Sequence, residues 1–200
     1  MAERRLRFER GCLRVGRLKG VPLRLHWTLP IGAVLFCGEQ GGPVAWGAFA
    51  ALILVHELGH AALVRRYRLH VIDVTLHGAG GECHYSGEPT EMQRTLIAWG
   101  GVVAQAMVLV IACLALAPHG PPSPTRDALV TAFIDRNLAM ILLNLLPFRP
   151  LDGGEAWKIV GVLARRSGRR SRLRAEAAAI ERQLRSSKEE RHPGQDKDLN

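Results

Sequence analysis

Apolar residues in this chain are gathered into long blocks, with short polar or glycine- and proline-rich stretches between them. The clearest block, Leu96 to Ala117, holds 22 residues without a charge. A helix of that length crosses a hydrocarbon core of about 30 Å, at a rise of about 1.5 Å per residue. Three other stretches are also predominantly apolar: Val21 to Cys37, Pro43 to Val64 and Ala128 to Pro147. The pattern predicts four transmembrane helices, the first interrupted by Arg24, His26 and Pro30.

The stretch from Val71 to Gly87 has a different character. Apolar and polar residues alternate around Val74 and Leu76, and several glycines follow. Alternation with a period of two, bounded by glycine, is typical of strands and turns. The predicted fold class is therefore an all-α membrane protein of about four transmembrane helices, with a small β-hairpin-like re-entrant or interfacial segment.

The charged residues lie beside the apolar blocks. The formal net charge is +9, and cations concentrate near the amino terminus, at Arg65, Arg66 and Arg68, and in the tail. Since Lys and Arg prefer the cytoplasmic side, four spans place all three basic regions there. We therefore expect a multi-pass protein of the cell membrane with both termini cytoplasmic. Residues 1–20 form a basic cytoplasmic segment, residues 21–165 a membrane-embedded domain and residues 166–200 a basic, polar cytoplasmic tail.

Several finer expectations follow from composition. The glycine-rich turn at 38–42 and the proline-rich loop at 118–127 fall outside the cell, and the tail is expected to hold a short amphipathic helix and a disordered end. The basic start lacks a small-residue cleavage site, so it is not expected to be a removable signal peptide. The four cysteines show no CxxC pair and are expected to be reduced thiols. Zinc-finger pairing and phosphate-binding loops are absent from the sequence, so no nucleic acid partner is expected.

The second block contains the motif HELGH at residues 56–60. His56 and His60 are four residues apart and share one helix face, where two imidazoles can bind the same Zn²⁺. Glu57 lies beside them and can take the proton of a water activated by the metal. Imidazole and carboxylate groups inside a membrane span are costly unless they are paired or bind a metal, so the position favours function. A polar cluster that only joins helices is the alternative.

A catalytic zinc needs a third protein ligand and an open position. Asp152 lies five residues beyond Pro147, on the cytoplasmic side that the HELGH helix also approaches. Asp135 lies about 25 Å of helix away from Asp152 and is rejected on distance. The predicted depth in the membrane does not exclude four other residues as the third ligand, although solvated loop or helix-end positions suit them better: Glu155, His70, His77 and His84.

HELGH and the sequence NLLPFRPLDGG at 144–154 resemble the two signature motifs of the site-2 protease family of intramembrane zinc metalloproteases, peptidase family M50. The similarity covers about residues 16–165. It implies one Zn²⁺ per chain held by His56, His60 and Asp152, with Glu57 as the catalytic base. Where the family commonly has Gly-Pro followed by Asn, this chain has Gly101, Val102 and Gln105. We expect that departure to change helix packing or substrate contact without touching a metal ligand.

The expected function is hydrolysis of peptide bonds in membrane-embedded or membrane-tethered proteins, so the expected partners are such substrates and the lipid bilayer. An exposed strand edge within 71–87 can hold an extended substrate by backbone pairing, and a purely structural loop is the alternative. Asn144 can contact substrate or join helices. Two other classes compete: a catalytically inactive membrane scaffold, and a soluble zinc protease whose third apolar block is a buried helix.

Overall fold

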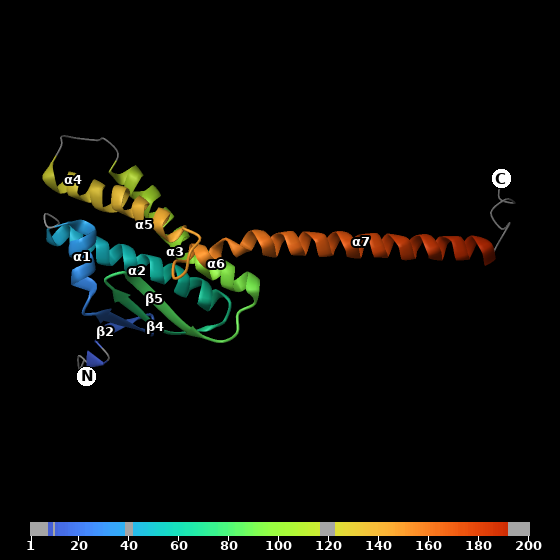
Figure 1. Cartoon of the computed structure of the whole chain (residues 1–200), viewed down its shortest axis with the longest axis horizontal. Coiled ribbons are helices and arrows are strands. Elements are labelled where there is room, and N and C mark those ends of the chain that lie inside the picture. The colour runs from blue at the N-terminus through green and yellow to red at the C-terminus, as the bar shows by residue number, and fades with distance from the viewer. Residues whose placement is uncertain (1–7, 10, 39–41, 117–122, 192–200) are drawn as a thin grey trace. The chain divides into compact units, whose positions relative to one another are not determined.

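The computed structural model describes residues 8–9, 11–38, 42–116 and 123–191. The chain forms two compact units, Met1–Ile159 and Val160–Asn200. In the first unit a five-stranded sheet accompanies a set of helices (Figure 1). The strands are β1 (Phe8–Glu9), β2 (Cys12–Leu18), β3 (Val21–His26), β4 (His70–His77) and β5 (Gly80–Ser86). The helices are α1 (Leu29–Cys37), α2 (Pro43–Arg66), α3 (Glu91–Ala115), α4 (Pro124–Val130), the π-helical η1 (Thr131–Arg136), α5 (Asn137–Asn144) and α6 (Gly153–Ala156).

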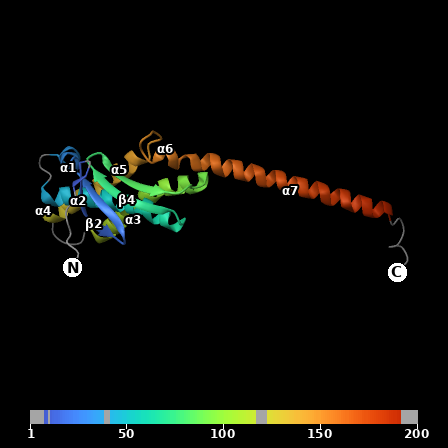
Figure 2. The ribbon, with the colours of Figure 1, turned by 90° about the horizontal axis from the view of Figure 1, so that it is seen from below.

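The sheet has the strand order β1-β2-β3-β4-β5. Strands β3 and β4 run parallel, and the other neighbouring pairs are antiparallel. The sheet lies against α2 (Figure 2), where Val74 and Leu76 of β4 pack with Leu52 and Ile53 in the main core. Strand β5 is the last in the order, so one of its edges has no neighbouring strand in the described sheet.

The hairpin expected within 71–87 is confirmed as β4 and β5, but the prediction of an all-α fold is wrong. Strand β2 lies inside the segment expected to be only a basic cytoplasmic extension, and β3 lies inside the first expected span. In β3 the apolar residues Val21, Leu23 and Leu25 alternate with Pro22, Arg24 and His26 and pack on the core. This period of two belongs to a strand with one buried face.

The first expected span is therefore a strand followed by a helix of nine residues, α1. Its two ends are tied to the two ends of α2. Arg65 Nη1 donates to the Lys19 carbonyl before β3 at 3.3 Å, and Cys37 Sγ donates to the Ala45 carbonyl at 3.5 Å. The chain thus travels the length of α2, about 36 Å for its 24 residues, as strand plus short helix.

Two described helices, α2 and α3, are long and apolar enough to cross a membrane. They pack closely where Gly59 meets Gly100, since a Cβ on Gly100 would lie 2.6 Å from the Gly59 carbonyl oxygen. Small residues allow such close helix contacts. The fourth expected span is one continuous helical stretch, α4, η1 and α5, that ends at Asn144. Its Arg136 donates to the Cys37 carbonyl at 3.0 Å, which gives this cation a partner inside a mostly apolar block.

The second unit holds most of helix α7 (Lys158–Arg191). The helix is longer than the short one expected, because it continues through the polar sequence up to Arg191. Residues 1–7, 10, 39–41, 117–122 and 192–200 lie outside the described part of the chain. The expectations for the start of the basic segment, for most of the turn at 38–42, for the first half of the proline-rich loop and for the last tail residues concern these positions.

Candidate metal centre

The centre is built on one face of α2, where His56, Glu57 and His60 are buried, with 5%, 3% and 7% of their surfaces exposed. Their separation of one helical turn places the two imidazole rings side by side, with Nε2 atoms 3.0 Å apart. Ligand atoms of all three side chains lie within 4.8 Å of one another. The HELGH motif thus forms a compact group of possible metal ligands.

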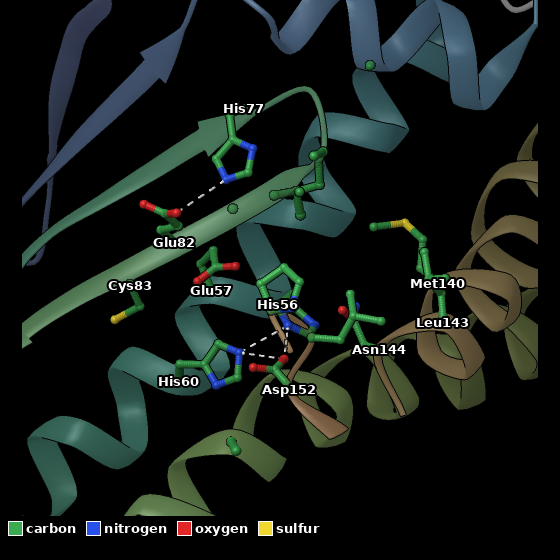
Figure 3. Close-up of a pocket in the computed structure, with 18 of the residues that line it drawn as sticks. His56, Glu57, His60, His77, Glu82, Cys83, Met140, Leu143, Asn144 and Asp152 are labelled. Carbon is green, nitrogen blue, oxygen red and sulfur yellow. Dashed lines mark hydrogen bonds and ion pairs between the residues drawn. The ribbon is translucent and has the colours of Figure 1, made fainter. Parts of the chain in front are cut away.

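Asp152 comes from the loop between α5 and α6 and completes the cluster (Figure 3). Its Oδ2 atom lies 2.7 Å from His56 Nε2 and 3.1 Å from His60 Nε2. The next residue, Gly153, allows this loop to close, because a Cβ there would lie 2.6 Å from the Leu145 carbonyl oxygen. Trp99 of α3 holds the far side of the loop by donating to the Ala156 carbonyl at 3.1 Å. The structure therefore brings together the three residues predicted as ligands.

The other ring nitrogens of the two histidines are also held. His60 Nδ1 donates to the Ile97 carbonyl at 2.7 Å, and His56 Nδ1 donates to Gln105 Oε1 at 2.9 Å. A neutral ring that donates from Nδ1 presents an unprotonated Nε2, so each Nε2 lone pair faces the Asp152 carboxylate. Three acceptor atoms within 3.1 Å of one another repel unless a cation lies between them. Two imidazoles and a carboxylate with fixed outer contacts suit Zn²⁺.

Helix α3 and strand β5 leave room for these groups only because glycines face them. A Cβ on Gly101 would lie 2.5 Å from His56 Nε2 and 2.6 Å from His60 Nε2. A Cβ on Gly81 of β5 would lie 2.6 Å from Glu57 Cγ. The backbone therefore covers both the imidazoles and the carboxylate of Glu57 at close range.

The surroundings of the site shift the pKa values of Asp152 and Cys83, which both lie outside the long helices. Burial would raise the pKa of Asp152, but the close imidazoles of His56 and His60 hold that pKa well below its usual range. Burial, with the nearby Glu57 and Asp73 carboxylates, raises the pKa of the Cys83 thiol to about 12. Cys83 is thus a protonated thiol and not a thiolate ligand. None of the described cysteines forms a disulfide.

The residues left open as third ligands lie elsewhere. Glu155 is paired with Arg149 and Lys158, although it lines the same cavity. His77 and His84 belong to the β4–β5 hairpin near Glu82. His70 is exposed at the start of β4. Asp135 lies in η1 and is not among the residues that line the cavity.

The expectation that the departure at 101–105 touches no ligand is wrong, because Gln105 is a direct hydrogen-bond partner of His56. Gln105 is fully buried, and its own carbonyl accepts from Asn137 Nδ2 at 3.1 Å. A polar residue in the middle of an uncharged membrane block was the available signal, since such residues usually have a partner. The identity of that partner depends on how α3 is rotated against α2.

A cavity of about 940 Å³ adjoins the cluster. Its walls include α1, α2, α3, α5, the turn after β4 and strand β5. Asn144 at the end of α5 also lines it, and its side chain makes no hydrogen bond to the described residues. Metal ligands, a buried carboxylate and a strand edge therefore share one space.

Comparisons with known proteins agree with this arrangement, although no protein-family model matches the chain. It is 30% identical over 177 residues to a candidate zinc metalloprotease of Synechocystis sp., covering 77% of this chain and 46% of the relative. It is 32% identical over 166 residues to a candidate zinc metalloprotease of Mycobacterium tuberculosis, covering 72% and 42%. It is 24% identical over 154 residues to a zinc metalloprotease of Methanocaldococcus jannaschii, covering 74% and 45%. The chain spans a little under half the length of these relatives.

A solved structure shares the fold. The site-2 protease from Methanocaldococcus jannaschii matches with a TM-score of 0.61 and 21% sequence identity, over 74% of this chain and 71% of that one. The fold and the cluster, a His-Glu-x-x-His helix with an aspartate from a distant loop, are those expected of a metalloprotease. The chain is related to these zinc metalloproteases and shares the site-2 protease fold, in agreement with the resemblance of the two motifs. The individual roles of His56, Glu57, His60 and Asp152 stay predictions.

Proposed function

We propose that the protein is an intramembrane zinc metalloendopeptidase, which hydrolyses peptide bonds in membrane-embedded or membrane-tethered proteins. The observation that carries this proposal is the meeting of His56 Nε2, His60 Nε2 and Asp152 Oδ2 within 3.1 Å, beside Glu57 and an adjoining cavity. His56, His60 and Asp152 would hold one Zn²⁺ per chain. That ion would polarise a peptide carbonyl and raise the acidity of a water molecule.

The protein's own groups have distinct tasks in this proposal. Glu57 accepts the proton of the attacking water and passes it to the leaving amine, which requires a carboxylate close to the ligands. The imidazole Nδ1 bonds to Ile97 and Gln105 keep the Nε2 atoms aimed at the metal. Asn144, with a free amide at the cavity wall, donates a hydrogen bond to the substrate carbonyl.

The substrate must be extended at the reacting bond, because a helix conceals its peptide groups in its own hydrogen bonds. The free edge of β5 supports this step. Residues from Gly80 to Tyr85 line the cavity, and Gly81 lies against Glu57. A substrate segment that adds to this edge as a further strand would run past the metal centre.

Membrane placement rests on the surface of α3 as well as on its length. Its apolar side chains are exposed along one stripe that holds Val103, Met107, Val110, Ile111 and Leu114. A soluble zinc protease would bury such a helix, whereas lipid covers this stripe at no cost. Helix α2, which packs against α3, is also long and apolar enough to cross a membrane. We therefore retain a multi-pass topology with both termini cytoplasmic.

The test compares the purified full chain with Glu57→Gln, in lipid and at equal zinc content, on a membrane-peptide substrate. The amide keeps the size of Glu57 but cannot accept the proton, so turnover should fall by about 10²- to 10⁴-fold while zinc is retained. Glu88→Gln, which changes an exposed carboxylate after the hairpin, is the matched control and should not alter turnover. Equal turnover by Glu57→Gln would refute the mechanism. An unmutated chain that binds zinc but cleaves no membrane peptide would instead indicate an inactive scaffold.

A further inference from the structure

A second group of imidazole and carboxylate side chains lies on the β4–β5 hairpin, at the rim of the same cavity. It consists of His77 near the end of β4, with Glu82 and His84 on β5. His84 Nε2 lies 3.1 Å from Glu82 Oε2, and His77 Nε2 lies 4.0 Å from Glu82 Oε1. One carboxylate thus has an imidazole Nε2 near each of its oxygen atoms.

The ring of His84 is oriented by a buried carboxylate. Its Nδ1 donates to Asp73 Oδ1 at 2.9 Å, and Asp73 is only 5% exposed. Asp73 is itself held by Arg24 at 3.4 Å and by the Thr75 hydroxyl at 3.3 Å. A carboxylate that accepts from one imidazole nitrogen while the other nitrogen points outward is the usual support of a metal-binding histidine.

The ring of His77, in contrast, has a nitrogen without a hydrogen-bond partner among the described residues. This nitrogen, Nε2, is buried. Figure 3 shows the ring pointing toward the Glu82 carboxylate on the neighbouring strand. A buried nitrogen without a partner is costly, and a cation held between His77 and Glu82 would satisfy it.

We propose that His77, Glu82 and His84 form an accessory site for a divalent transition-metal ion such as Zn²⁺. Two imidazoles and one carboxylate favour Zn²⁺, Ni²⁺ or Cu²⁺ over Mg²⁺ and Ca²⁺, which prefer oxygen ligands. The side chains of His84 and Glu82 are 51% and 60% exposed, so an ion can reach them from solvent and keep water in its remaining positions. A bound ion would join the two strands near their turn.

The accessory site is separate from the first centre. Successive residues of a strand alternate between its faces, so Glu82 and His84 lie on the face of β5 opposite Gly81 and Cys83. Gly81 lies against Glu57, and Figure 3 places Glu57 and Cys83 across the strand from His77. Binding at the hairpin therefore does not require an intact first centre or any proteolytic activity.

The experiment measures zinc bound per chain for the purified, metal-stripped full chain in detergent, across buffered free zinc concentrations. The unmutated chain should bind two zinc ions. His77→Ala removes the unpartnered nitrogen without breaking a hydrogen bond, and should lower the affinity for the second zinc ion by at least about tenfold. His70→Ala, at the far end of the same hairpin, is the matched control and should still bind two.

A second pair of variants makes the result independent of the first centre. His60→Ala should lose the first ion and keep the hairpin ion, and adding His77→Ala should lower the affinity for the hairpin ion as well. Saturation of the unmutated chain at one zinc would overturn the proposal. So would a second zinc that survives both His77→Ala and His84→Ala. Neither measurement uses a substrate, so its outcome does not depend on whether the chain is a protease.

Discussion

The two clusters of imidazole and carboxylate groups differ in how completely the fold holds their side chains. In the α2 centre three possible metal-ligand atoms lie within 3.1 Å of one another, and each histidine forms a hydrogen bond through its Nδ1 atom. On the hairpin His84 is held by a hydrogen bond to Asp73, whereas His77 Nε2 lies 4.0 Å from Glu82 Oε1 and has no hydrogen-bond partner among the described residues.

The difference indicates what each cluster is suited to do. A site whose ligands are already fixed loses little conformational freedom when an ion binds, so it holds that ion tightly. A half-exposed site must first order its side chains and binds more weakly. We therefore expect the α2 centre to retain its zinc as a permanent component, and the hairpin to exchange its ion with the surroundings.

The largest effect should come from removing a ligand of the α2 centre. Loss of an outer hydrogen-bond partner commonly weakens a metal by about 10- to 100-fold, so Asp152→Ala should exceed that range for the first zinc. Glu155→Ala is the matched control, because its carboxylate lines the same cavity but is paired with Arg149 and Lys158. Competition with a chelator of known affinity measures both. Tight zinc binding by Asp152→Ala, together with its loss in Glu155→Ala, would show that the third ligand is misassigned.

A smaller effect is expected from the outer contact of His56. Gln105→Leu preserves volume in a fully buried position but leaves His56 Nδ1 without an acceptor. Zinc affinity of the α2 centre should fall by about 10- to 100-fold, and Gln105→Glu, which keeps an acceptor, should restore most of it. The hairpin ion should be unaffected in both variants. Equal zinc affinity in Gln105→Leu and the unmutated chain would show that the contact does not orient His56.

The parts of this fold that could be predicted from the sequence are those decided by local pattern. Helices α2 and α3 follow from long apolar blocks, and the hairpin follows from alternation and glycine. The approach of Asp152 to His56 was predicted because charge bias and helix length together fix depth in a membrane.

What was missed depends on packing or on an ambiguous signal. From the sequence, the arginines of β2 are interpreted as charges before a span and Arg24 of β3 as an interruption within it, yet the solvent-facing side of a strand selects the same residues. The contact of Gln105 with His56 depends on the rotation of α3, which is set by the Gly59–Gly100 contact. No property of Gln105 alone specifies its partner.

The last prediction concerns two glycines near the same helix pair. Gly101→Ala places a methyl group 2.5 Å from His56 Nε2, and the ring cannot move without breaking its bond to Gln105. Overpacking of this kind costs about 1–3 kcal/mol of stability. Gly47→Ala in α2 has no atom within 4 Å of the added carbon, so it should instead stabilise the helix by about 0.5–1 kcal/mol.

Thermal unfolding of both variants, with and without zinc, measures these changes. Gly101→Ala should unfold at a lower temperature than the unmutated chain, and zinc should raise that temperature less than usual, because stabilisation by a ligand depends on its affinity. Gly47→Ala should show the normal response to zinc. If Gly101→Ala were as stable and as responsive as Gly47→Ala, α3 would not cover the imidazoles as closely as described. The contrast between a fixed centre and a loosely held hairpin site would then lose its structural basis, since backbone contact with α3 is what leaves the two rings no room to move.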